Sequence, residues 1–353
     1  MKSNDKNGSK IDVIFCKGDG SFVDDSEQLK AAESVASGVQ LAARLVDSHP
    51  ELMTTTRFAE EVEMLVSQNP KVSLTQLVGE ELQKSGYGAL YAVGKAATCP
   101  PRLILLEYDG GGDETIALVG KGIVYDTGGL SLKSKDGMCG MKHDMGGASG
   151  LLGGFFSAVE LNVKKKVHCI LCLAENSIGP TAFRNDDILS MYSGKTVEVN
   201  NCDAEGRLVL ADGVAHATKN IEGLDLVVDM ATLTGAQLVA TGKKHAGILA
   251  SDEDVEKRAM SCGLHSGDLC FPLLYYPDLM DEFKSEVADM KNSVKDRSNA
   301  QTSCAGHFIE SHLDESYIGG WLHVDMAGPG SDGERATGYG VGLVLSLLDA
   351  PGF

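Results

Sequence analysis

Apolar residues recur at helical spacing in the first part of the chain, which predicts two amphipathic helices there. These helices would span residues 26–47 and 57–68. Residues 72–84 fit either a third helix or a strand followed by a helix, and the apolar run at residues 11–16 fits a short strand.

The pattern changes in the middle of the chain, where β-rich segments become frequent. Residues 102–108 and 115–120 flank the Gly-rich turn at residues 109–113, which predicts a β-hairpin. The other predicted elements are an Ala/Gly/Leu-rich buried helix over residues 146–161, a further helix over residues 208–219, and continuous apolar strands over residues 167–174 and 224–230. Such continuous apolar runs are typical of buried parallel strands. Alternating strands and helices predict an α/β sandwich.

The composition is that of a globular protein, and it narrows the functional classes. Hydrophobic residues make up 43% and charged residues 23% of the 353 residues. The net charge is −19, and the basic run at residues 164–166 stands alone, so we expect no nucleic-acid partner. The acidity serves solubility, or it attracts metal cations and the positively charged N-termini of substrates.

The cysteines and the start of the chain bear on location. Nine cysteines follow no framework spacing, and Cys169 and Cys172 would face opposite sides of one strand, which favours core packing. The polar segment at residues 1–10 indicates a frayed tail, and no apolar run reaches the length of a membrane span. We therefore expect a soluble, reduced, cytoplasmic protein without a membrane partner.

The residues with chemical potential are concentrated in two segments, residues 119–147 and 201–208. Together these segments contain the carboxylates Asp126, Asp144, Asp203 and Glu205 and the cations Lys121, Lys133 and Arg207. Each of these residues taken alone is more often a turn or surface charge. Taken together, the acidic residues follow apolar strands and adjoin Gly-Gly pairs, where ligands of α/β sheets bind.

The acidic residues suit divalent cations. Asp203 and Glu205 are two residues apart and would project to the same side of an extended segment. Four carboxylates carry a charge of about −4, which matches two divalent ions. Oxygen donors suit Mg²⁺ and Mn²⁺, and Zn²⁺ also accepts carboxylates.

The second segment reads Asn-Cys-Asp-Ala-Glu-Gly-Arg-Leu, which resembles the Asn-Thr-Asp-Ala-Glu-Gly-Arg-Leu signature of the leucyl aminopeptidase (cytosol aminopeptidase) family. The spacing of Lys121, Asp126, Lys133 and Asp144 is similar to that of the family, as is Ala-Thr-Leu-Thr-Gly-Ala at residues 231–236.

The resemblance extends over roughly nine-tenths of the chain, from about residue 35 to the C-terminus. Residues 22–26 and 333–338 are most similar to the animal branch of the family described as probable aminopeptidase-like. The resemblance implies a three-layer α/β sandwich with a mixed, mostly parallel central sheet flanked by helices.

The resemblance also implies a ligand set for two divalent ions, Zn²⁺ and/or Mn²⁺, with Mg²⁺ or Co²⁺ as alternatives. Asp126 and Glu205 would bridge the ions, Asp203 would complete the more exchangeable site, and Lys121 and Asp144 would complete the tighter site. Lys121 would bind as a neutral amine, which nearby divalent charge favours by lowering its pKa.

The remaining implied roles concern catalysis and substrate binding. Lys133 would polarise the scissile carbonyl, and Arg207 would hold a bicarbonate ion that acts as general base. A bridging metal-bound hydroxide would attack, while the free α-amine of the substrate binds one ion. The residues that would contact the first substrate residue are Met141, Thr232, Gly235 and Ala327 along the side-chain pocket and Leu233 through its main chain.

The chain departs from the family pattern in two places. Cys202 stands where the family has Thr, and we interpret it as a buried neutral thiol. Residues 1–34 would be a remnant of the N-terminal domain and its linker, and residues 35–353 the catalytic domain. The shortened N-terminus leaves open a trimer or a hexamer as the self-associated form.

These observations predict a metalloaminopeptidase that releases apolar, leucine-like N-terminal residues from peptide substrates. One alternative is a non-catalytic structural or regulatory relative that is inactive because assembly fails. Another is a different two-metal hydrolase, such as an amidase or a Cys-Gly dipeptidase. His143, beside Asp144, would act from outside the ligand set or face solvent, and His323 would be structural.

Overall fold

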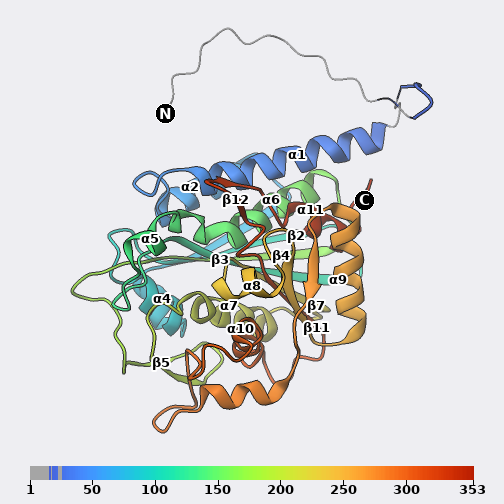
Figure 1. The fold of residues 1–353 in the computed structure, drawn as a ribbon. Helices are drawn as coiled ribbons and strands as arrows, with labels where there is room; N and C mark the ends of the chain where they lie inside the picture. Colours follow the sequence, from blue (N-terminus) through green and yellow to red (C-terminus); the bar gives the residue numbers. More distant parts are fainter. Residues whose placement is uncertain (1–15, 17, 23–25) are drawn as a thin grey trace.

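The fold is built on one large, mixed β-sheet, seen in a computed structural model that describes residue 16, residues 18–22 and residues 26–353 (Figure 1). In spatial order its strands are β1 (Val72–Val78), β2 (Arg102–Asp109), β4 (Lys166–Asn176), β3 (Thr115–Asp126), β7 (Leu226–Ala231), β11 (Gly320–Asp325), β8 (Ala246–Ala250) and β9 (Cys270–Pro272). Four neighbouring pairs are parallel and three are antiparallel. The four central strands, β4, β3, β7 and β11, all run in one direction.

Helices cover both faces of this sheet and make it the middle of three layers (Figure 1). One face is covered by α1 (Ser26–Asp47), α2 (Thr55–Ser67), α6 (Gly146–Glu160), α9 (Glu253–Ser266) and α11 (Val341–Leu347). The other is covered by α3 (Glu80–Lys84), α4 (Gly88–Gly94), α7 (Gly206–Asn220), α10 (Gln301–Glu310) and the 3₁₀ helix η2 (Pro277–Phe283). Each face has its own apolar core. Cys169 and Cys172 of β4 belong to different cores, as their spacing predicts.

Short elements complete the fold. They are α5 (Lys135–Met138), the 3₁₀ helix η1 (Met141–Met145), α8 (Gly235–Ala240), a small sheet of β5 (Ile188–Ser190), β6 (Thr196–Glu198) and β10 (Met290–Lys291), and the strand pair β12 (Ser331–Asp332) and β13 (Arg335–Ala336). The three-layer α/β fold and the mixed central sheet confirm the expected fold class.

The predicted helices and buried strands are confirmed with small shifts of their ends. The ambiguous segment at residues 72–84 is a strand followed by a helix, β1 and α3. The strand predicted over residues 11–16 lies, except for Cys16, outside the described residues.

The hairpin predicted across residues 102–120 is wrong. β2 and β3 are strands, but β4 lies between them, antiparallel to β2 and parallel to β3. The turn therefore carries the chain past the position of β4, a strand that begins about 50 residues later in the sequence. Local sequence marks the two strands and the turn, whereas the pairing depends on β4, a distant segment.

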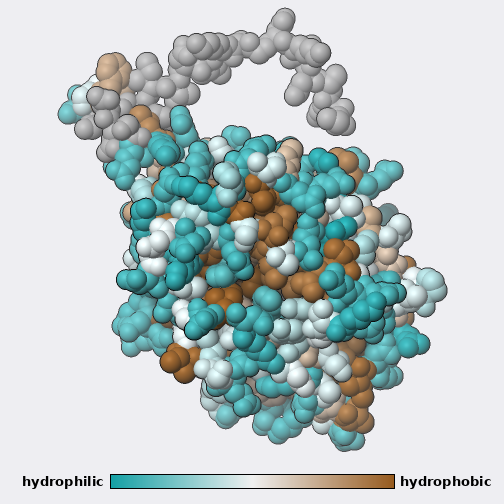
Figure 2. Space-filling view, turned by 180° about the vertical axis from the view of Figure 1, so that it is seen from behind, coloured by the Kyte–Doolittle hydropathy of each residue, from teal (hydrophilic) through white to brown (hydrophobic). Residues whose placement is uncertain are grey.

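Some apolar side chains remain exposed on the surface of the molecule. On the face opposite to that of Figure 1, they gather near the middle and polar side chains surround them (Figure 2). Within the described part of the chain, no helix combines the length and the apolar character that crossing a bilayer requires.

Candidate functional site

A cavity of about 840 Å³ opens where the central parallel strands end. Asp126 is the last residue of β3, while Thr232 and Ala327 follow β7 and β11. The N-terminus of α7 and the short helix η1 add Glu205 and Asp144. Carboxyl ends of parallel strands meet at one edge of a sheet, and this brings together residues that are far apart in sequence. Apart from Arg207, all the predicted site residues line this cavity.

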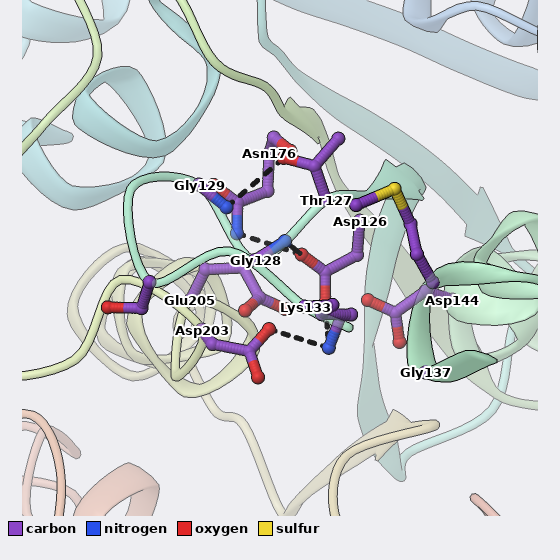
Figure 3. A network of polar contacts seen from close by, with 12 residues as sticks. Asp126, Thr127, Gly128, Gly129, Lys133, Gly137, Asp144, Asn176, Asp203 and Glu205 are labelled. Carbon is purple, nitrogen blue, oxygen red and sulfur yellow. Dashed lines mark hydrogen bonds and ion pairs between the residues drawn. The ribbon is translucent and has the colours of Figure 1, made fainter. Parts of the chain in front are cut away.

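One half of the polar cluster is centred on Lys133. Its Nζ lies 2.9 Å from Asp126 Oδ2 and 2.6 Å from Asp203 Oδ1 (Figure 3). The other oxygen of Asp126 accepts hydrogen bonds from the Gly128 N–H and from Asn176 Nδ2, both at 2.8 Å. Both carboxylates are thus held in place, and the ammonium group of Lys133 lies between them.

The other half is centred on Lys121, which is 3% exposed in the middle of β3. Its Nζ lies 2.7 Å from Asp144 Oδ1 and 3.1 Å from Glu205 Oε1, and it also donates to the Thr232 carbonyl. The Thr232 hydroxyl donates to the same Asp144 oxygen at 3.1 Å. Lys121 therefore joins a strand, η1 and the start of α7.

Burial and crowding of like charges dominate the electrostatics. Burial, aided by the neighbouring carboxylates, raises the pKa of Asp126, Asp144 and Asp203, and most strongly that of Asp144. Although burial opposes the charged form, the surrounding carboxylates raise the pKa of Lys121 and of Lys133 above its ordinary value. The cluster thus holds four acids against two ammonium groups, which leaves an excess of negative charge.

This excess fits a site for cations. Asp126, Asp203 and Glu205 each present a carboxylate oxygen, and these atoms lie within 4.8 Å of one another. Asp144 Oδ2 and Glu205 Oε2 are buried and have no hydrogen-bond partner among the described residues. A buried carboxylate oxygen without a partner is costly, and a divalent ion would remove that cost. The residues therefore suit divalent metal ions.

Arg207 lies at the start of α7, 5% exposed, with its guanidinium 5.8 Å from the centre of the Phe283 ring. Burial lowers its pKa to about 10, so it remains charged at neutral pH. Within the described structure, its Nε and Nη1 atoms find no hydrogen-bond partner. Two unpaired donors on a buried cation form a site that a small anion could occupy.

The predicted substrate-binding residues surround the cluster. Met141, Thr232, Leu233, Gly235 and Ala327 line the cavity, together with Leu238 and Gly330. The Leu233 N–H already donates to Asp325 at 3.1 Å.

Two residues that the sequence analysis did not select position this site. Asn176, the last residue of β4, donates to Asp126 Oδ1 and to the Cys202 carbonyl. Asp325, the last residue of β11, accepts hydrogen bonds from Leu233, Thr234 and Ala327. Both are polar residues that end an apolar strand, the same signal that identified Asp126.

The other sequence-based interpretations can be compared with the structure directly. Cys202 is fully buried, which confirms the expected burial, and burial raises the pKa of its thiol, in agreement with a neutral form. His143 is half-buried and lines the cavity, and burial lowers its pKa. His323 is buried and lies 2.6 Å from Asp229, in agreement with a structural role.

The profile described as "Cytosol aminopeptidase family, catalytic domain" matches residues 40–345. The mouse probable aminopeptidase NPEPL1 is 52% identical over 91% of this chain, and leucine aminopeptidase 1 of Caenorhabditis elegans is 44% identical over 89%. Leucyl aminopeptidase of Trypanosoma brucei in complex with bestatin superimposes with a TM-score of 0.89, at 48% identity, over 91% of this chain and 62% of that one. The match spans 61% of the mouse protein and 64% of the worm protein.

Proposed function

Because this chain belongs to the cytosol aminopeptidase family, we propose that it is a metal-dependent aminopeptidase that releases single, preferably apolar, residues from the N-termini of peptides. The observation that carries the proposal is the cluster of four carboxylates and two lysines at one end of a cavity of about 840 Å³. A cavity of this size accommodates the first residues of a peptide.

Five residues would hold two divalent ions, namely Lys121, Asp126, Asp144, Asp203 and Glu205. When bound, the ions would supply Lewis acidity and lower the pKa of a water molecule. Lys121 would have to lose its proton to act as a ligand. Positive ions on the same carboxylates would counteract the negative charge that raises its pKa.

The two remaining cations would act on the substrate. Lys133 is 17% exposed and lies at the cavity wall, where its ammonium group can approach the scissile carbonyl and stabilise negative charge on its oxygen. Arg207, with two unpaired buried donors, would hold a bicarbonate ion as general base. The acidic cluster also attracts the positively charged α-amine of the substrate, which favours cleavage of the first residue.

The first test is hydrolysis of Leu-amide by metal-stripped protein with Mn²⁺, Zn²⁺, Co²⁺ or Mg²⁺ added back. We expect metal-dependent release of leucine, and inhibition by bestatin, which binds the related Trypanosoma brucei enzyme. Light scattering on the same sample measures self-association, for which the resemblance predicts a trimer or a hexamer. Equal hydrolysis of N-blocked and free peptides would contradict the exopeptidase proposal, and a preference for Cys-Gly would favour a dipeptidase. Silence with every metal would favour a non-catalytic relative.

A single substitution tests the metal ligands. Glu205→Gln should lower kcat/KM for Leu-amide at least about a hundredfold, because loss of a metal contact removes several kcal/mol of transition-state stabilisation. The matched control is Glu222→Gln, an exposed residue outside the cavity, which should leave kcat/KM unchanged. Metal content measured on both variants should fall only for Glu205→Gln, and full activity in that variant would remove Glu205 from the ligand set.

A further inference from the structure

Asp47, the last residue of α1, joins this helix to the strand pair β12–β13. Its Oδ1 accepts a hydrogen bond from the Ala336 N–H at 2.9 Å, and its Oδ2 lies 2.6 Å from Arg335 Nε. The two contacts use both oxygens of one carboxylate on adjacent residues of β13. Two directed contacts from one carboxylate fix the position of the strand, in addition to neutralising the charge of the arginine.

The main chain of Asp47 makes a third contact, to a different wall of the cavity. Lys142 of η1 donates from Nζ to the Asp47 carbonyl at 2.9 Å. The carbonyls in the last turn of a helix lack partners within the helix and carry partial negative charge, so a lysine there is favourable. The next residue, His143, and Glu334 on the β12–β13 turn both line the cavity.

The Asp47 side chain is itself in an unfavourable place for its charge. A carboxylate at the C-terminus of a helix is repelled by the helix dipole. Its side chain is only 15% exposed, so water compensates it weakly, and the partners on β13 supply the compensation. Loss of the carboxylate would therefore release β13 without creating a cavity in the core.

The residues that Asp47 connects belong to the cavity itself. Asp47, Lys142 and His143 line it from α1 and η1, and Ser331, Glu334 and Arg335 line it from the β12–β13 segment. η1 also carries Met141 and Asp144, which line the same cavity. One residue thus connects two walls of the cavity, η1, which carries Met141, and the β12–β13 segment.

We propose that Asp47 is a positioning residue that holds η1 and the β12–β13 segment at the spacing required to bind the N-terminal side chain of a peptide. The inference rests on the proposed aminopeptidase function. It assigns to the end of α1 a role in substrate selectivity, although Asp47 lies 74 or more positions before the cation-binding residues in sequence.

The test compares Asp47→Ala and Asp47→Asn with Asp281→Asn, an exposed acid paired with Lys284 outside the cavity. Asp47→Ala should raise KM for Leu-amide about tenfold, the loss expected for a charge-assisted hydrogen bond, with kcat changed less than about threefold. Its preference for Leu-amide over Ala-amide should also fall. Asp47→Asn keeps an acceptor for the Ala336 N–H, so its KM for Leu-amide should lie between those of the wild type and Asp47→Ala. The KM of Asp281→Asn should match that of the wild type.

A second measurement does not depend on activity. Hydrogen–deuterium exchange of residues 331–336 should be faster in Asp47→Ala than in the wild type, and Arg335→Gln should produce the same change from the other side of the pair. Unchanged exchange together with unchanged KM would overturn the proposal, as would an equal loss of kcat/KM on Leu-amide and Ala-amide. If the wild type has no activity, the proposed function fails. The hydrogen–deuterium exchange of residues 331–336 still decides whether Asp47 holds the β12–β13 segment in place.

Discussion

At the scale of single residues, Asn176 shows how a neutral side chain can organise a charged site. It is fully buried, and its Nδ2 donates both to Asp126 Oδ1 and to the carbonyl of Cys202, the residue before Asp203. The main-chain carbonyl of Asn176 accepts a hydrogen bond from the Thr127 hydroxyl. Asn176 therefore couples the end of β3 to the segment that carries Asp203 and Glu205, without adding charge.

Asn176→Ala should weaken binding of Mn²⁺ by about 10- to 100-fold, because residues that orient metal ligands commonly contribute this much to affinity. Titration with a competing chelator measures the change. Asn299→Ala, at an exposed asparagine that pairs with Glu282, is the matched control and should bind Mn²⁺ as the wild type does. Wild-type affinity in Asn176→Ala would show that Asp126 is oriented without it.

At the scale of elements, α6 approaches the sheet closely because glycines face it. A Cβ atom at Gly147 would overlap the carbonyl oxygen of Met230 on β7, and one at Gly120 on β3 would lie 2.6 Å from Ala148 Cα. Glycine is thus required on both sides of this contact. The close approach places η1, directly before α6, and therefore Asp144, next to Lys121 on β3.

Gly147→Ala should lower the free energy of unfolding by about 1–3 kcal/mol or more, the usual cost of overpacking a core. Denaturant unfolding followed by circular dichroism measures it. Gly18→Ala is the control and should leave the free energy of unfolding unchanged, because no atom of the described residues beyond the chain neighbours lies within 4 Å of the added Cβ. A neutral Gly147→Ala would mean that α6 can move away from β7 at no cost.

At the scale of the whole molecule, buried histidines link global stability to pH. His312 is fully buried, its Nδ1 bonds to the Phe308 carbonyl, and burial lowers its pKa to about 4. His216 is partly buried, and this burial lowers its pKa to about 4 as well. The unfolded chain takes up these protons near pH 6.5, whereas the folded protein takes them up only near pH 4. Stability contributed by these neutral histidines is therefore lost as the pH falls from 6.5 to 4.

His312→Asn, which keeps a donor for the Phe308 carbonyl, should reduce this loss. The shift from 6.5 to about 4 corresponds to about 3 kcal/mol, so the variant should lose less unfolding free energy over this pH range by up to that amount. Chemical denaturation at a series of pH values measures the slope. His265→Asn, at an exposed position, is the control. If the unfolding free energy depends on pH in the same way in the wild type, His312→Asn and His265→Asn, then His312 does not cause the loss of stability.

Most local elements and the chemical character of the site could be predicted before the fold was known. Periodicity located α1 and α2, because a helix that buries one face repeats its apolar residues within the segment itself, and the Ala/Gly/Leu-rich composition located the buried helix α6. Polar residues after apolar strands identified the carboxylates, because the carboxyl ends of parallel strands converge on one site. Their roles as metal ligands remain a prediction that the metal experiments test.

The way in which distant segments meet could not be predicted from local patterns. The insertion of β4 between β2 and β3 overturned the predicted hairpin, because strand pairing is a choice among non-local partners. Asn176 and Asp325 end strands as Asp126 does, yet only their contacts show what they position. Asp47 carries no sequence signal, since its role arises where the end of α1 meets η1 and β13. Local sequence specifies what each segment prefers, and the packing of all segments together decides which side chains share a site.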